Sequence, residues 1–328
     1  MKTKRQRFEV FSKLRLMQFL TALAIITLFL APVIGQKSQK ASDYYNSGLQ
    51  KQEKGDLDGA LADYDKAIAL EPRLAAAYNN RANIKLQRED LDGAINDYSK
   101  AIQLNPRNVE TYFNRGVVHQ QKGDYDEAIA DFTSSIQLVP EFAMAYNNRG
   151  NARKARGDNE GAISDYTKAI EFNPKLTIAF YNRANAYQTK EDNVAAIRDY
   201  SAALESDPNF VDAYINRGQV RQSQREFDGA IADYSKAIEL KPDAGAYYVR
   251  GTVRQAKHDM DGALVDYSRA ISLDPTLAQA YTSRAVIETL QGKKAEAVQD
   301  FEKAFKIEPG LRRTFKDFID KRLNATPP

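Results

Sequence analysis

Apolar and small residues recur along this chain at the spacing of an α-helix. The 3.6-residue period of an amphipathic helix is followed by Leu57, Ala60, Leu61, Tyr64, Ala67 and Ile68. An earlier run with the same spacing contains Tyr44, Gly48 and Leu49, and the Lys-Gly-Asp segment at residues 54–56 interrupts the period. Residues 41–72 therefore predict two helices joined by a turn.

The two-helix pattern repeats every 34 residues, with one residue missing before Ala244. A proline stops the second helix of each repeat, at Pro72, Pro106, Pro140, Pro174, Pro208, Pro242, Pro275 and Pro309. We number the positions within a repeat as places 1 to 34, with the proline at place 32; the eight repeats then start at residues 41, 75, 109, 143, 177, 211, 244 and 278. A period of this length indicates a stacked array rather than separate globular domains.

Three places carry the side chains that pack the two helices of a repeat together. Place 4 is aromatic, place 8 is Gly or Ala, and place 20 is Ala in all eight repeats. Small residues at places 8 and 20 let the two helices approach closely. Over residues 41–309 this pattern resembles the tetratricopeptide repeat family. The resemblance implies an all-α, right-handed superhelical solenoid of eight helix-turn-helix units, and the amphipathic spacing within residues 310–328 predicts a C-terminal capping helix and tail.

The first 35 residues are unlike the array. Residues 1–15 hold six basic residues and one acidic one, and residues 16–34 form an apolar run without charge. Residues 1–35 are typical of a secretory signal peptide cut before Gln36, but a run of about 19 apolar residues is also long enough to be a membrane anchor. Both alternatives place the array on the extracytoplasmic side, because flanking positive charge resists translocation. Residues 36–40 are polar and are expected to form a linker.

Composition and charge exclude several classes of function. The formal net charge is +3, but the basic excess lies within residues 1–15, so the array has no basic surface for nucleic acid. The chain has no cysteine, which excludes disulfides and thiolate metal sites. It also lacks the motifs of phosphate-binding loops, zinc proteases and serine hydrolases. We therefore expect no cofactor, no metal site and no enzymatic activity.

Places 7 and 23 carry opposite charges with the regularity of the repeat. Both places border the faces on which the helices pack, so we predict structural ion pairs across each hairpin or to its neighbour. The alternative is a row of cations for acidic partners. The arginines are Arg81, Arg115, Arg149, Arg183, Arg217, Arg250 and Arg284, and the aspartates include Asp97, Asp131, Asp165, Asp199 and Asp233.

Place 6 is asparagine in the first six repeats: Asn46, Asn80, Asn114, Asn148, Asn182 and Asn216. Asparagine is a mediocre helix former, so its recurrence inside a helix favours a role in binding. The arrangement resembles the asparagine ladder in the repeat domain of the O-linked N-acetylglucosamine transferases, which implies that these amides grip the backbone of an extended peptide in a concave groove. An amide offers both a donor and an acceptor for such a backbone.

Neighbouring places give the expected groove a neutral, polar lining, with Asn79, Asn83, Asn147, Asn151, Asn185 and Gln188 as further peptide-binding candidates. The alternative is that all these amides only solvate a helix face. The sequence thus predicts a protein-interaction scaffold that binds extended segments of other proteins and contacts the membrane through residues 16–34 if these are retained. Two other functions remain open: a membrane-tethered assembly factor that uses the convex face, and a regulatory subunit of a separate enzyme.

Overall fold

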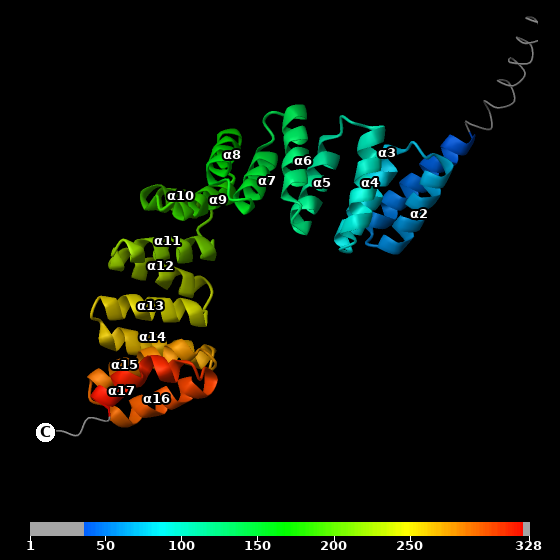
Figure 1. Ribbon diagram of the computed structural model, residues 1–328. Coiled ribbons are helices and arrows are strands. Elements are labelled where there is room, and N and C mark those ends of the chain that lie inside the picture. The colour runs from blue at the N-terminus through cyan, green and yellow to red at the C-terminus, as the bar shows by residue number, and fades with distance from the viewer. Residues whose placement is uncertain (1–35, 324–328) are drawn as a thin grey trace, which may run out of the picture. The chain divides into compact units, whose positions relative to one another are not determined.

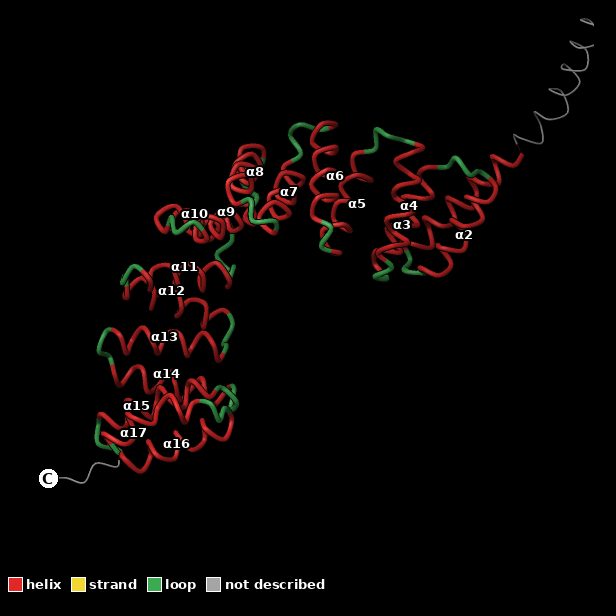
Figure 2. The backbone as a smooth tube through the Cα atoms, viewed as in Figure 1, coloured by secondary structure: helices red, strands yellow, loops and turns green. Residues whose placement is uncertain are grey.

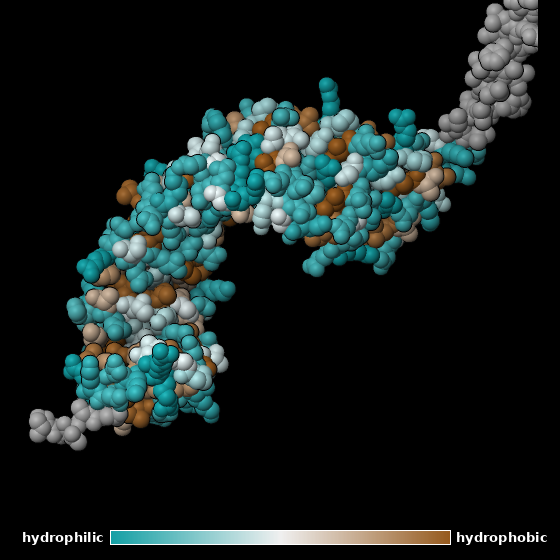
Figure 3. All heavy atoms as spheres, in the orientation of Figure 1, coloured by the Kyte–Doolittle hydropathy of each residue, from teal (hydrophilic) through white to brown (hydrophobic). Residues whose placement is uncertain are grey.

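The computed structural model describes residues 36–323, and every regular element in that range is an α-helix (Figures 1 and 2). The predicted all-α fold of paired helices is therefore confirmed. The chain divides into two compact units between Ala152 and Arg153. In the view of Figure 3, the described surface is mostly hydrophilic, with small and scattered hydrophobic spots.

The first unit contains a helix at residues 36–53, then α2 (Leu57–Leu70), α3 (Ala75–Gln87), α4 (Leu91–Leu104), α5 (Val109–Lys122), α6 (Tyr125–Leu138) and most of α7 (Ala143–Ala155). Helices α3 and α4 pack as one hairpin, and α5 and α6 as the next. Residues 36–40, which we expected to be a linker, are exposed and helical, and they continue without a break into the first repeat.

The second unit begins with the end of α7 and contains α8 (Asn159–Phe172), α9 (Thr177–Thr189), α10 (Asn193–Ser206), α11 (Val211–Ser223), α12 (Phe227–Leu240), α13 (Ala244–Ala256), α14 (Met260–Leu273), α15 (Ala278–Leu290), α16 (Lys294–Ile307) and α17 (Leu311–Arg322). Odd-numbered helices from α3 to α15 begin at the first residue of each aligned repeat. Pairs such as α9 and α10, or α13 and α14, form the hairpins.

A buried aromatic ring at place 24 forms the centre of each hairpin. The eight rings are at most 2% exposed: Tyr64, Tyr98, Phe132, Tyr166, Tyr200, Tyr234, Tyr267 and Phe301. A Cβ atom added to Gly251 at place 8 would lie 2.7 Å from Cε1 of Tyr267, which is closer than packing allows. Burial of the ring also raises the pKa of the Tyr64 hydroxyl to about 12. The small residue at place 8 is thus what allows the ring to enter.

The turn between the two helices of a repeat contains place 15, and the residue at this place has a positive φ in the left-handed region. Four repeats have glycine there, with φ between 78° and 85° at Gly55, Gly123, Gly157 and Gly292. The other four keep φ between 60° and 66° without glycine, at Glu89, Glu191, Arg225 and His258. The turn geometry is therefore imposed by the hairpin, and the four non-glycine residues accept backbone strain.

Replacing Glu191 with Gly is expected to raise the free energy of unfolding by about 0.5–1 kcal/mol, because glycine adopts a positive φ without strain. Chemical denaturation of the full-length chain measures the change. The matched variant Glu191→Ala keeps the Cβ atom and therefore the strain, so it should show no such gain. Equal gains in both variants would trace the effect to the lost carboxylate instead.

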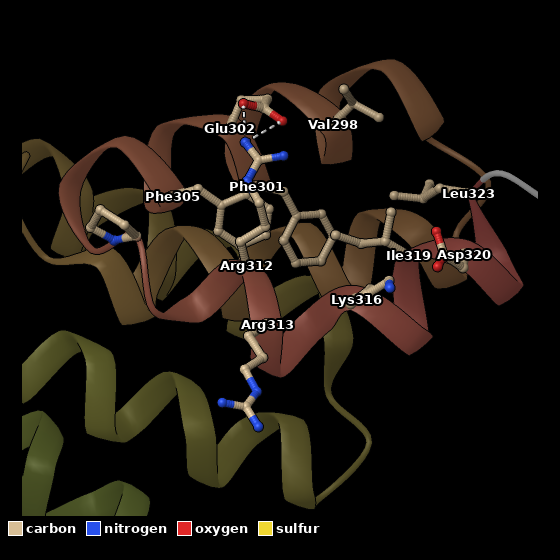
Figure 4. Close-up of a pocket in the computed structure, with 11 residues that line it drawn as sticks. Val298, Phe301, Glu302, Phe305, Arg312, Arg313, Lys316, Ile319, Asp320 and Leu323 are labelled. Atoms are coloured by element: carbon tan, nitrogen blue, oxygen red, sulfur yellow. Dashed lines mark hydrogen bonds and ion pairs between the residues drawn. The ribbon is translucent and has the colours of Figure 1, made fainter.

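Helix α17 covers the open end of the last repeat, as predicted for a capping helix. Its apolar residues pack against the buried rings of Phe301 and Phe305 on α16, through Leu311, Phe315, Phe318, Ile319 and Leu323. The two helices enclose a pocket of about 670 Å³ with an apolar floor (Figure 4). The Arg312 guanidinium lies 4.8 Å from the centroid of the Phe305 ring and bonds Glu302 at 2.9 Å. This pocket therefore belongs to the contact that caps the array.

Within residues 36–323, no helix is both long and apolar enough to cross a membrane. The predicted signal peptide or anchor at residues 1–35 lies outside the described residues, as does the end of the tail after residue 323.

Candidate functional site

Arginine at place 7 forms a two-pronged ion pair with aspartate at place 23 of its own hairpin. In the second repeat, Nε and Nη2 of Arg81 donate to Asp97 at 2.7 and 2.6 Å, and the aspartate is 5% exposed. The same pair joins Arg115 to Asp131, Arg183 to Asp199, Arg217 to Asp233, Arg250 to Asp266, and Arg284 to Asp300. These arginines hold buried carboxylates inside the fold.

The same arginines also tie each repeat to the one before it. Nη1 of Arg115 donates to Ser99 at 2.9 Å, and Nη1 of Arg149 donates to Thr133 at 3.1 Å. Each guanidinium further lies within 6.0 Å of the place 4 ring of its repeat, as Arg115 does over Tyr112. The hydrogen bonds that Arg115 donates to Asp131 raise the pKa of Arg115 above its ordinary value. The row of cations is thus occupied within the fold, which disfavours its use for acidic partners.

The sequence prediction missed a second cation on most of these aspartates. Place 11 is basic in six repeats, and five of these residues lie within 3.0 Å of the place 23 carboxylate: Lys51, Lys85, Arg153, Arg221 and Arg254. The sixth, His119, keeps Nε2 4.0 Å from Asp131. The second cation could have been predicted from the sequence, because a basic residue recurs at place 11, one helical turn after place 7. In the first repeat, Ser47 and Lys51 replace the arginine at Asp63; although burial raises its pKa, their hydrogen bonds lower it overall.

The last repeat reverses the charge at place 11. Glu288 is 13% exposed at its side chain, its Oε2 accepts no hydrogen bond among the described residues, and Oε1 lies 4.0 Å from Arg284. Burial, and then the nearby charge of Asp300, raise the pKa of Glu288 above its ordinary value. A carboxyl whose pKa is raised in the folded state favours folding while it is protonated, and that contribution is lost as the pH rises through the raised value.

Glu288→Gln is therefore expected to stabilise the last repeat at pH 7 by about 1 kcal/mol. At a pH below about 4, where the carboxyl is protonated in both states, the gain should vanish. Amide hydrogen exchange in α15 and α16 of the full-length chain measures it locally. Exposed Asp317→Asn on α17 is the control, because this carboxylate does not act on Glu288, and it should change little at either pH. A gain that persisted unchanged at low pH would contradict the role of the charge.

Asparagines at place 6 lie on one side of the first helices, and three of them donate hydrogen bonds to the preceding repeat. Nδ2 of Asn80 donates to the Tyr45 hydroxyl at 3.1 Å, and Nδ2 of Asn114 donates to Oδ1 of Asn83 at 3.3 Å. In the second unit, Nδ2 of Asn216 donates to the Tyr181 hydroxyl at 3.0 Å and to Oδ1 of Asn185 at 3.1 Å. Asn148 and Asn182 are half-buried, and Asn46 is exposed. We call these six residues the asparagine face.

Two predicted peptide-binding residues do not reach that face. Asn79 is 8% exposed and Asn147 is 2% exposed, because place 5 points toward the neighbouring helices. Their Nδ2 atoms donate to Oδ1 of Asn80 and Asn148 at 3.3 and 3.1 Å. Oδ1 of Asn79 also accepts from Thr111 at 2.9 Å. Assigning them to direct peptide contact was wrong, and they instead orient the place 6 amides.

Other predicted peptide-binding residues accept hydrogen bonds from the buried tyrosines at place 24. The Tyr98 hydroxyl donates to Oδ1 of Asn83 at 2.6 Å, and the Tyr200 hydroxyl shares its one hydrogen between Oδ1 of Asn185 and Oε1 of Gln188, at 2.5 and 2.8 Å. Asn151 is half-buried at the place that Asn83 and Asn185 hold in their repeats. The Nδ2 group of Asn83 donates to no atom in residues 36–323, so it stays available. Part of the amide lining is thus structural, which the sequence did not distinguish.

Among residues 36–323, no three His, Asp or Glu side chains gather in a way that would hold a metal ion.

Models of known families match most of the array. Those described as TPR repeat match residues 48–87, 82–123 and 150–191. Those described as tetratricopeptide repeat match residues 109–142, 178–210, 211–243 and 278–310. Together they cover more than half of the chain. The chain therefore belongs to the tetratricopeptide repeat family.

Solved proteins of this family are similar in fold. The C-terminal part of a TPR repeat-containing protein from Cytophaga hutchinsonii matches with a TM-score of 0.63 and 19% identity, over 72% of this chain and 97% of that one. A tetratricopeptide repeat protein from Parabacteroides merdae gives 0.57 and 20%, over 81% and 99%. pilF of Pseudomonas aeruginosa gives 0.55 and 19%, over 65% and 96%. At these identities the likeness concerns the fold alone. A comparison with curated proteins gave no match.

Proposed function

We propose that this protein is a non-enzymatic interaction scaffold whose asparagine face binds extended segments of partner proteins through their backbone. The observation that carries the proposal is the unused hydrogen-bonding capacity of the place 6 amides. Each amide has two N–H groups and an oxygen with two lone pairs. Within the fold, Asn80 donates one N–H and accepts one hydrogen bond at its oxygen, and Asn114 donates a single N–H. Asn80 and Asn114 therefore each keep a donor and an acceptor for a ligand, whereas Asn216 donates twice within the second unit and keeps only its oxygen.

The bonds already made support this use of the remaining ones. Asn80 and Asn114 are each fixed by a partner on the preceding repeat, and Asn80 and Asn148 are each fixed by the buried asparagine next to them. A fixed amide loses less conformational entropy when a ligand binds, so more of each hydrogen bond contributes to affinity. An arrangement that only solvated the helix would not need this support from Asn79 and Asn147.

The spacing of the repeats also fits an extended chain. Helices of neighbouring repeats stack at roughly 10 Å, and an extended peptide advances about 3.3 Å per residue. One asparagine therefore meets every third peptide residue, and Asn80, Asn114 and Asn148 of the first unit together take a segment of roughly seven residues. Neutral hydrogen bonds of about 0.5–1.5 kcal/mol each, less the ordering of the peptide, give an affinity on the order of micromolar.

The test uses peptides selected from a random 15-residue library on the immobilised full-length chain. Each selected peptide is then resynthesised with single N-methyl groups on successive backbone nitrogens. If the face reads the backbone, N-methylation should weaken binding at every third residue, whereas alanine at the same positions should weaken it less. Peptides whose binding depends on side chains alone, or failure to select any peptide, would refute the proposal.

We further propose, from residues 1–35 of the sequence, that the array works on the extracytoplasmic side of a membrane. The mature N-terminal residue of the native protein and the protease accessibility of the array in intact cells test this. A mature chain that starts at Gln36 would indicate a cleaved signal peptide, and an intact N-terminus on a protected array would contradict the placement.

A further inference from the structure

One cation interrupts an otherwise neutral and acidic surface beside the asparagine face. Places 2, 6, 9, 12 and 13 of the first helices share one side of the helix. Across all eight repeats these places carry a single basic residue, Lys154, and three acidic ones, Glu53, Glu110 and Asp212. Lys154 stands at place 12 near the C-terminal end of α7.

Other repeats show what a side chain at place 12 does. Glutamines there accept a hydrogen bond from the buried place 24 tyrosine of the same hairpin. The distances are 2.7 Å for Gln52, 2.8 Å for Gln188, 3.0 Å for Gln222 and 2.6 Å for Gln255. Place 12 therefore lies beside the hydroxyl group of the buried tyrosine. An ammonium group has no lone pair and cannot accept this bond. Lys154 therefore cannot take the role that glutamine has at place 12.

The fold supplies no counter-charge for Lys154. No carboxylate lies within ion-pair distance of its ammonium in residues 36–323, whereas the basic residues at place 11 are paired with aspartate in five repeats. The side chain is half-buried, and this burial lowers the pKa of the amine below its ordinary value. A partly desolvated cation among amides gains more from a carboxylate than an exposed lysine does.

We propose that Lys154 binds the side-chain carboxylate of an aspartate or glutamate in an extended segment held by the second unit, so that the partner is an acidic peptide. This inference rests on the proposed function and adds the class of peptide to it. The remaining charges on the face agree with one acidic contact per segment, because Glu53, Glu110 and Asp212 would repel acidic residues elsewhere.

The experiment starts from the peptides selected on the full-length chain. We expect them to share one Asp or Glu, and changing it to Asn or Gln should weaken binding about tenfold, as for a hydrogen bond to a charged group. In Lys154→Gln, which restores the residue found at place 12 of four other repeats named above, the same peptide change should alter affinity less than twofold. Lys175→Gln removes the same charge from an exposed turn of the fourth repeat and should behave as the unmodified chain.

Each outcome separates this inference from the proposed function. Peptides that bind through their backbone but share no acidic residue, or that bind Lys154→Gln as tightly as the unmodified chain, would overturn the role of Lys154 and leave the scaffold standing. Loss of binding on C-terminal amidation, with no effect of Asp→Asn, would overturn the side-chain assignment in favour of a terminal carboxylate. Failure to select any peptide would overturn both proposals.

Discussion

Arg115→Ala is expected to lower the free energy of unfolding of the first unit by about 3–5 kcal/mol, as for a buried ion pair that loses one partner. Asp131 is 4% exposed, and Arg115 donates to both of its oxygens at 2.8 and 2.7 Å. The second cation is missing here, because Nε2 of His119 stays 4.0 Å away. The variant therefore leaves a buried carboxylate without a charged partner.

The chain contains a graded comparison for this prediction. In Arg250→Ala, Arg254 still holds Asp266 at 3.0 Å, so the loss should be clearly smaller than for Arg115→Ala. Arg107→Ala removes an exposed arginine from a turn of the same unit as Arg115 and should cost less than about 0.5 kcal/mol. Chemical denaturation and amide exchange of the full-length chain measure all three. Equal losses for Arg115→Ala and Arg250→Ala would contradict the role of the second cation.

Removing the carboxylate as well should restore part of the stability. In the double variant Arg115→Ala and Asp131→Ala no buried charge is left, and the remaining cost is the lost packing of both side chains. The double variant should therefore be more stable than Arg115→Ala alone. If it were less stable, the arginine would act through its contacts with Ser99 and Tyr112 rather than through the ion pair.

The sequence predicted the helices and their pairing because the side chains at places 4, 8, 20 and 24 repeat without exception. The sequence did not distinguish amide residues that support the fold from amide residues that face a ligand, because both roles use the same residue type. Asn79 and Asn80 are neighbours of identical chemistry, and only the packing of the next repeat shows that one is buried and the other lies at the surface. In the same way, the glutamine at place 12 serves a buried tyrosine, which no periodicity of polar residues reveals.

The turns show the opposite case, in which the structure overrides a local preference. Glycine, which adopts a positive φ without strain, stands at place 15 of four repeats, whereas Glu89, Glu191, Arg225 and His258 stand there in the others. All eight turns share the same backbone region. The packing of two helices on each side fixes the turn, and one strained residue costs less than a displaced helix.

Replacing Asn80, Asn114 and Asn148 with Ala is expected to weaken binding of a selected peptide to the first unit roughly a hundredfold. Three amides each lose a donor and an acceptor to the peptide backbone, and the net loss of about 3 kcal/mol follows from neutral hydrogen bonds. Alanine is the better helix former, so helicity should not fall. Stability should fall modestly, because the buried amides of Asn79 and Asn147 lose their acceptors. Fluorescence anisotropy with a labelled peptide and circular dichroism measure the two effects.

A control with the same loss of polar side chains uses the exposed amides of the second helices, Asn96, Gln103 and Gln137, changed to Ala together. Because these side chains lie away from places 6 and 9, binding should stay within about twofold of the unmodified chain. The asparagine face is specific only if the two triple variants differ. Should both bind equally well with intact helicity, the amides would only solvate the helices, and the regular asparagine at place 6 would need a reason other than a ligand.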